Sequence, residues 1–193
     1  MQDRYRDIVY GAGDETGLSP VEDLGTREIR MITGAFQFQL ATVTPSGWPY
    51  LQYRSGPPGF LHHLGGNRIG FGDLRGNQQL VTVGNLAQSG RAALFLADYP
   101  MRSRLKLFGT AAVVPADDDP ALLEALMLVP EGRLERTPER CIVIDVEAFD
   151  WNCAKALVPQ YTAEQVRERT DLYVQQIRDL QRQLDEARGG REH

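Results

Sequence analysis

The chain has 193 residues, a net charge of −5 and 42% hydrophobic residues, which suits one globular domain with a small appendage. Its acidic balance, with a sequence pI near 5.3, argues against general nucleic-acid binding, because that function needs a basic surface. No apolar run approaches the roughly 18 residues of a membrane span, and the first residues lack the apolar segment of a signal peptide. Two isolated cysteines, Cys141 and Cys153, suit a reducing compartment and disfavour a zinc site. We therefore expect a cytoplasmic protein that binds neither nucleic acid nor membrane and holds no metal.

The first predicted elements are a helix and a β-hairpin. Residues 20–35 carry apolar side chains on one loose stripe, with Pro20 in the first turn, and predict a helix. Residues 36–43 alternate between apolar and polar side chains, the period of a half-buried strand. A turn at 44–47 then leads into a second strand at 48–54.

The rest of the core is predicted as four more strands and two short helices. In chain order these are a strand at 67–72, a helix at 74–88, strands at 92–97 and 104–114, a helix at 120–128 and a strand at 141–149. Strands joined by short turns favour a mainly β fold, a β-barrel with flanking helices. A βαβ alternation and a Gly-rich fingerprint are both missing, so a Rossmann dinucleotide site is not expected.

The last 32 residues differ from this core. Thr162 to Gln165 form a T-x-x-Q capping box that predicts the start of a helix. Apolar residues then follow at 4-3-4 spacing, the spacing of a heptad seam: Tyr173, Ile177, Leu180 and Leu184. We expect residues 1–161 to form the barrel domain with an N-terminal helix, and residues 162–193 to form a helical extension that packs on the barrel or on a partner subunit.

Candidate ligand-binding residues lie at glycine-flanked strand ends. Arg54, Ser55 and the Gly56 amide could all donate to a phosphate. Side-chain amides at Asn77, Gln78 and Asn85 flank the predicted short helix, and Arg102 and Arg104 form a small cationic stretch. Turn glycines and solvated arginines are the commoner explanation of each of these features when it is taken alone.

Acid–base and nucleophilic catalysis have little support. His62 and His63 are adjacent, so their side chains point in opposite directions, and we expect both to be ordinary loop or surface residues. No serine lies in a G-x-S-x-G elbow. No catalytic side chain is therefore assigned.

Four segments, taken together in this order, resemble the pyridoxamine 5'-phosphate oxidase-like FMN-binding proteins. The resemblance covers roughly residues 28–161, and the segments are FQLATVTPSGWPYLQYRSGPPGF (38–60), NRIGFGDLRGNQQLVTVGNLAQSGRAALFLADY (67–99), RLKLFGTAAVV (104–114) and DWNCAKALVPQY (150–161). It implies a six-stranded FMN-binding split barrel and a homodimer with flavin mononucleotide (FMN) in clefts between the subunits.

The resemblance also implies roles for individual residues. Arg54 and Ser55 look like phosphate-binding residues, with Asn77 and Gln78 beside them. Asn85, Arg102 and Arg104 could donate to the N1/C2 edge of the flavin, where charge gathers on reduction. Trp151 could cover part of the ring or plug the barrel, and these two readings stay open.

The chain departs from the true oxidase at two places. Gly76-Asn77-Gln78 stands where that enzyme has a Ser-Arg-Lys type segment, and Asp150 to Cys153 replace its basic substrate-binding segment. We therefore expect an FMN-dependent oxidoreductase of unknown substrate, without vitamin B6 chemistry. The alternatives are a flavin-binding protein that stores flavin or senses redox state without turnover, and the same fold with a deazaflavin or haem as ligand.

Overall fold

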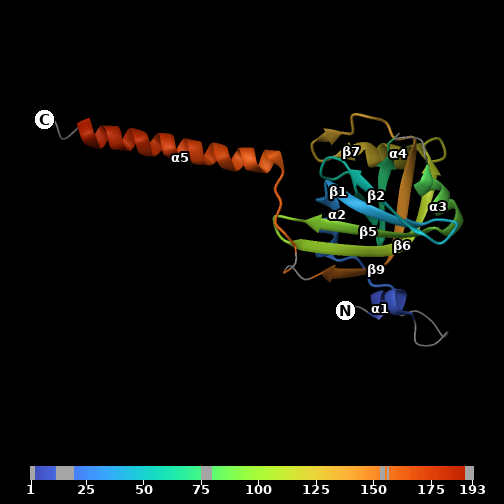
Figure 1. The fold of residues 1–193 in the computed structure, drawn as a ribbon. Helices are drawn as coiled ribbons and strands as arrows, with labels where there is room; N and C mark the ends of the chain where they lie inside the picture. The colour runs from blue at the N-terminus through green and yellow to red at the C-terminus, as the bar shows by residue number, and fades with distance from the viewer. Residues whose placement is uncertain (1–2, 12–19, 75–79, 153–154, 156, 190–193) are drawn as a thin grey trace. The chain divides into compact units, whose positions relative to one another are not determined.

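An antiparallel sheet with the strand order β2-β1-β5-β6-β9-β4-β3 forms the body of the computed structural model (Figure 1). The structure describes residues 3–11, 20–74, 80–152, 155 and 157–189. The sheet strands are β1 (Gln37–Val43), β2 (Pro49–Ser55), β3 (His62–Gly65), β4 (Arg68–Asp73), β5 (Arg91–Asp98), β6 (Ser103–Pro115) and β9 (Arg140–Asn152). The other elements are α1 (Asp3–Tyr10), α2 (Thr26–Thr33), α3 (Val81–Ser89), α4 (Pro120–Met127), a small hairpin of β7 (Leu128–Val129) and β8 (Gly132–Arg133), and α5 (Ala163–Gly189).

The sheet curls until strands far apart in its order meet through their side chains. Strands β1, β5, β6 and β9 lie between β2 and β4 in the sheet. Even so, Nη1 of Arg54 on β2 lies 2.8 Å from Oδ1 of Asp73 on β4. The ring of Phe38 on β1 also packs edge-on against Phe71 on β4, with 5.2 Å between centroids. The interior of the curled sheet is therefore closed by side-chain contacts.

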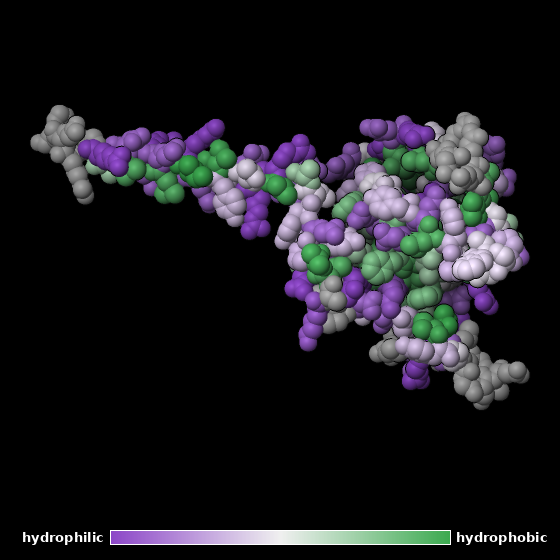
Figure 2. Space-filling model, viewed as in Figure 1, coloured by the Kyte–Doolittle hydropathy of each residue, from purple (hydrophilic) through white to green (hydrophobic). Residues whose placement is uncertain are grey.

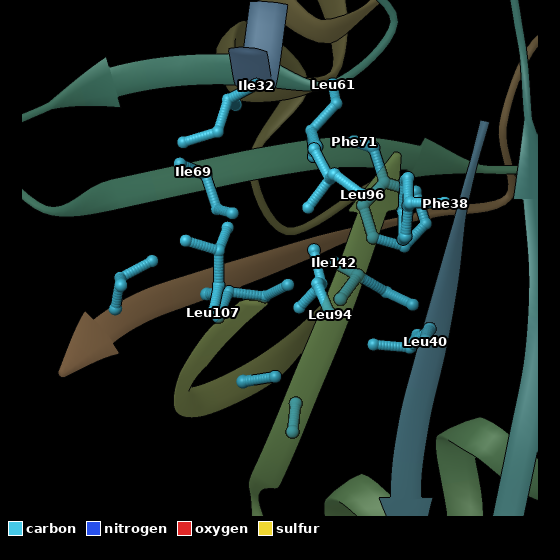
Figure 3. Close-up of a cluster of buried hydrophobic side chains, with 14 of the residues drawn as sticks. Ile32, Phe38, Leu40, Leu61, Ile69, Phe71, Leu94, Leu96, Leu107 and Ile142 are labelled. Atoms are coloured by element: carbon cyan, nitrogen blue, oxygen red, sulfur yellow. The ribbon is translucent and has the colours of Figure 1, made fainter. Parts of the chain in front are cut away.

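Alternating burial along the strands explains this core. In β1, Phe38, Leu40 and Thr42 are buried while their neighbours on the other face remain partly exposed. Residues from β4, β5, β6 and β9 fill the same interior (Figure 3): Ile69, Phe71, Leu94, Leu96, Leu105, Leu107, Ile142 and Ile144. Each buried aliphatic or aromatic side chain of this kind contributes about 1.5–3 kcal/mol to folding.

A β-bulge in the longest pairing lets the sheet curl. Between β6 and β9, Phe108 lies opposite Ala148 but Gly109 lies opposite Val146, so Glu147 is the extra residue. A Cβ atom on Gly109 would lie 2.1 Å from the carbonyl oxygen of Asp145, so this crossing requires glycine. The Glu147 carboxylate accepts a 2.7 Å hydrogen bond from Arg4, which ties α1 to the sheet.

The predicted mainly β fold is confirmed, and all six predicted strands are present within a few residues of their expected bounds. The strand predicted at 141–149 is longer and runs from Arg140 to Asn152. Strand β3, helix α1 and the β7–β8 hairpin were not predicted. His62 and His63 lie in β3, where their Nε2 atoms contact the carbonyl oxygens of Leu126 and Gly66 at 3.1 and 2.8 Å.

The prediction was wrong about where two helices begin. Residues 20–25 are not helical, because the side chain of Asn67 binds the backbone of this segment at the Leu24 N–H (2.8 Å) and the Glu22 carbonyl (3.0 Å). Leu24 is buried as a result, and α2 starts at Thr26. Helix α3 starts at Val81 because Leu80 has a left-handed backbone, with φ of 50°. Residues 75–79 of the helix predicted at 74–88 lie outside the described residues.

The chain divides into two compact units, Met1–Asp98 with Arg102–Leu157, and Tyr99–Met101 with Val158–His193. The second unit contains α5, whose predicted capping box is confirmed. The N–H of Gln165 donates to Oγ1 of Thr162 (3.2 Å), and the N–H of Thr162 donates to Oε1 of Gln165 (3.0 Å). Among the described residues, no helix is both long enough and apolar enough to cross a bilayer.

Candidate functional site

A cluster of polar side chains lies where the ends of β2 and β4 meet, and we call it the Arg54 cluster. It consists of Gln52, Arg54, Asp73, Thr82 and Arg140. Oε1 of Gln52 accepts hydrogen bonds from Nη2 of Arg54 (3.1 Å) and from Oγ1 of Thr82 (2.6 Å). Arg54 also forms the 2.8 Å ion pair with Asp73, while Nε of Arg140 lies 3.9 Å from the other Asp73 oxygen. The cluster thus connects β2, β4, β9 and α3.

The two guanidinium groups of this cluster are balanced by two carboxylates, Asp73 and the neighbouring Glu139. Asp73 is shared by two guanidinium groups, and Glu139 pairs with Arg140 at 2.5 Å. Burial raises the pKa of Asp73 above its usual value; Arg54 and Arg140 oppose that shift and Glu139 adds to it. Nε of Arg54 is buried and has no hydrogen-bond partner among the described residues. One strong donor of the cluster is therefore left without a hydrogen bond among the described residues.

A cavity of about 370 Å³ opens beside the end of β2. This volume lies within the roughly 300–1,000 Å³ of small-molecule sites. Ser55 and Gly56 line the cavity on the β2 side, and Leu74 on the side of the β4 end. The other lining residues are Pro57, Phe60, Gly72, Val129, Glu131, Arg133, Leu134, Glu135 and Arg136. Of the predicted pair Arg54 and Ser55, Ser55 therefore lines a cavity of suitable size, and Arg54 directly precedes it in β2.

A second cavity of about 460 Å³ is lined by residues of α1 and of strands β1, β5 and β6. Small residues such as Ala41, Ala93 and Gly109 form part of its wall, and Arg91 and Glu147 supply charges. None of the residues predicted from sequence lines it.

The two amide groups predicted beside the phosphate, Asn77 and Gln78, lie outside the described residues. Asn85 is described, and it is buried in α3 with 3% of its surface exposed. Its Nδ2 donates a 2.8 Å hydrogen bond to Oγ1 of Thr42 on β1. Asn85 therefore already holds α3 against the sheet.

Trp151, on β9, is also held by neighbouring side chains. Its Nε1 donates a 2.5 Å hydrogen bond to Oε1 of Glu28, and the guanidinium of Arg27 lies 3.8 Å from the centre of its ring. The other oxygen of Glu28 accepts from the Gly25 N–H at the start of α2 (3.0 Å). Trp151 also packs against the buried core. Of the two predicted roles, plugging the barrel agrees with these contacts.

Arg102 and Arg104 lie near Trp151 in the sheet. Arg102 adopts a positive φ of 53° before β6, and its Nη2 donates to the backbone oxygen of Lys155 (3.1 Å). Arg104 pairs with Asn152 across β6 and β9, and the neighbouring Leu105 pairs with Trp151. Strands β1 and β5 separate this group from Arg54 on β2. Within one chain, the predicted site residues thus form two groups.

The sequence did not predict four members of the Arg54 cluster: Gln52, Asp73, Thr82 and Arg140. One signal was present, because Asp73 is a carboxylate that ends a buried strand, where an unpaired charge is costly. Its partners come from β2 and β9, and nothing in the local sequence indicates that these strands meet.

Comparison with known proteins gives the same fold. The family model described as pyridoxamine 5'-phosphate oxidase matches residues 27–152. Among solved structures, HupZ of Group A Streptococcus has a TM-score of 0.53 at 17% identity, covering 72% of this chain and 100% of HupZ. The conserved hypothetical protein Rv2991 of Mycobacterium tuberculosis has a TM-score of 0.53 at 14% identity, covering 75% of this chain and 94% of that protein. No curated protein sequence matches the chain.

The matched segment spans most of the curled sheet, so the chain belongs to the pyridoxamine 5'-phosphate oxidase family. Its mainly antiparallel sheet with flanking helices is the split-barrel fold of that family. The chain is thereby placed in a flavin-binding group of proteins.

Proposed function

We propose that this protein binds FMN as a homodimer and acts as an FMN-dependent oxidoreductase. The observation that carries the proposal is the buried Nε of Arg54, which lacks a hydrogen-bond partner among the described residues and belongs to the residue that precedes Ser55 at the cavity. A buried guanidinium donor left without a partner is costly, and a phosphate oxygen would remove that cost. Membership of a flavin-binding family supports the same ligand.

In this proposal Arg54 and Ser55 hold the phosphate of FMN. The guanidinium of Arg54 donates from Nε, the Ser55 hydroxyl donates from the side of β2 that lines the cavity, and Asn77 and Gln78 follow the end of β4. The Asp73 carboxylate competes with the phosphate for Arg54, because it lies 2.8 Å from Nη1. Phosphate affinity therefore depends on the charge of Asp73.

Asn85 and Trp151 act as positioning residues in this proposal. Asn85 fixes α3 through Thr42, and Trp151 fixes α2 through Glu28. Arg102 and Arg104 are proposed to face the flavin ring of the partner subunit's site, because β1 and β5 separate them from Arg54 in their own chain. The flavin itself supplies the hydride or electron transfer when it is bound, so no protein side chain needs to act as acid or base.

The surface of β2 supports a homodimer. Three large side chains at this sheet edge are exposed: Trp48 by 72%, Leu51 by 65% and Tyr53 by 56%. Exposed aromatic and aliphatic residues that gather in this way are typical of an interface between subunits. A second copy of the chain would cover them and bring its Arg102–Arg104 stretch toward the first.

The deazaflavin and haem alternatives use the same fold. Haem iron needs an axial ligand such as His, Cys, Met or Tyr. None of these residue types occurs among the residues that line the two cavities described above. The absorbance spectrum of the purified protein distinguishes flavin, deazaflavin and haem.

Turnover separates an oxidoreductase from a storage or redox-sensing protein. The FMN-loaded protein should be reduced by NADH or NADPH without oxygen and reoxidised by an added acceptor over many cycles. Conversion of pyridoxine 5'-phosphate to pyridoxal 5'-phosphate should remain negligible, because Gly76-Asn77-Gln78 and the Trp151 segment differ from the oxidase. Reduction limited to one turnover would contradict the enzymatic part of the proposal, and efficient pyridoxal 5'-phosphate formation would contradict the exclusion of vitamin B6 chemistry.

A further inference from the structure

Helix α5 carries an apolar seam that is exposed in the single chain. When Ile177 is assigned to heptad position a and Leu180 to position d, positions a and d recur along the helix from residue 166 to residue 187. The seam residues are Val166, Thr170, Tyr173, Ile177, Leu180, Leu184 and Ala187. The five large apolar members have exposed fractions of 50–64%. Hydrophobic residues along the helix are visible in Figure 2.

The spacing of the seam indicates that its partner is another helix. Seam residues alternate strictly between three and four positions apart, a mean period of 3.5. Such a pattern keeps the seam facing one supercoiled partner, whereas a straight helix with a period of 3.6 drifts away from it. Ile177 at a and Leu180 at d follow the preference of parallel two-stranded coils for a β-branched residue at a and leucine at d.

Charges beside the seam favour a parallel pair of identical helices. The charged residues at the flanking e and g positions are all arginines: Arg167, Arg169 and Arg188. In a parallel pair in register, each g residue faces the e residue five positions later in the second copy, so Arg169 meets Val174 and Arg188 meets Gln183. No pair contains two charges. The antiparallel pair that overlaps all three heptads would set Arg167 near Arg188 of the second copy, where like charges repel.

We infer that α5 is an interaction surface for a second copy of this chain, and that the two helices form a parallel, in-register coiled coil. The inference rests on the proposed homodimer, because three heptads are marginal as an isolated pair. Joining the helices to a dimer of barrels raises their effective concentration to the order of millimolar. A parallel pair also shares the two-fold axis of such a dimer.

Disulfide trapping in the full-length protein tests this arrangement. In a background with Cys141 and Cys153 replaced by alanine, Leu180→Cys puts one thiol in the seam, and Gln175→Cys puts one at position f on the opposite face. In the parallel pair the two residues 180 lie in the same layer. Under mild oxidation, Leu180→Cys should form a covalent dimer at least about tenfold faster than Gln175→Cys, since a disulfide needs Cα atoms roughly 4.4–6.8 Å apart.

Three outcomes would overturn the inference. Equal rates at 180 and 175 would mean random collision, and failure of both to react would mean an unpaired helix or a different partner. A third outcome is that Ile177→Cys mixed with Leu180→Cys reacts faster than Leu180→Cys alone, which would mean an antiparallel pair. Circular dichroism of each variant checks that the helix is retained.

Sedimentation measures whether the protein is a dimer, and released flavin measures whether it binds FMN. Together they test the proposed function separately from the coiled coil. A dimer that contains FMN but fails to cross-link at 180 rejects only the coiled coil. A protein that cross-links at 180 without binding FMN rejects only the flavin proposal.

Discussion

The Arg54 cluster and the surroundings of Trp151 differ in how far the fold already occupies their polar groups. At Trp151, the ring nitrogen bonds to Glu28, the ring face meets Arg27, and part of the remaining surface packs on the core. At Arg54, Asp73 and Gln52 bind two nitrogens, while Nε has no partner among the described residues and a cavity opens beside Ser55. Residue type and position suggested both as cofactor contacts, but the Trp151 ring nitrogen already has a partner whereas Nε of Arg54 has none among the described residues. The contacts of Trp151 therefore hold parts of the fold together, whereas the Arg54 cluster is the one proposed above to hold a ligand.

Replacing Trp151 should give the largest effect, on stability and not on phosphate recognition. Trp151→Ala should lower the free energy of unfolding by about 3 kcal/mol, since it leaves a cavity and removes the partner of the buried Glu28 carboxylate. Trp151→Phe keeps most of the packing and should cost less, on the order of 1 kcal/mol for the lost hydrogen bond. Urea unfolding measures both values. Loss of FMN binding with unchanged stability would show instead that Trp151 contacts the cofactor.

Replacing Arg54 should mainly weaken FMN binding. Arg54→Ala should cost about 1.5–3 kcal/mol, around 10- to 150-fold in Kd, because a charge-assisted contact to the phosphate is lost. Riboflavin, which has no phosphate, should bind as before. Arg68→Ala is the matched control, because Arg68 is exposed and pairs with Asp145 on the same sheet. An equal loss of FMN and riboflavin would mean that Arg54 serves only to support the fold.

The pH dependence of binding should give the smallest effect. Burial raises the pKa of Asp73, so its carboxylate takes up a proton at a higher pH than usual and then no longer competes for Arg54 or repels phosphate. The preference for FMN over riboflavin should therefore grow as the pH is lowered through that raised pKa. It should decrease when the pH is raised through the same pKa, because Asp73 then ionises.

Asp73→Asn isolates this contribution, because the flavin phosphate titrates equally in both proteins. The variant should lose the part of the pH dependence that Asp73 causes, measured by fluorescence titration of both flavins. Identical pH profiles for the two proteins would show that Asp73 does not face the phosphate.

The sequence predicted local structure better than contacts between distant segments. The alternation in residues 36–43 and the T-x-x-Q box at Thr162 are local patterns, and both elements formed as predicted. Asn67, by contrast, binds the backbone near Leu24 and prevents a helix there, an effect that depends on residues more than 40 positions apart.

The same limit applies to the candidate site. Arg54 could be proposed from its place at a glycine-flanked strand end. Its pairing with Asp73 depends on the curl of the whole sheet, and the contact between Trp151 and Glu28 joins residues 123 positions apart. Side chains can therefore be assigned to a site from sequence, whereas their existing partners become visible only in the fold.

The most direct test of the central claim is to identify the ligand and its phosphate dependence in one titration series. The purified protein should show flavin absorbance and release FMN on denaturation, in an amount equal to the chain concentration. The apoprotein should then quench the fluorescence of added FMN more strongly than that of riboflavin. A colourless protein that fails to quench added FMN, or one whose spectrum shows a haem or deazaflavin, would contradict the account.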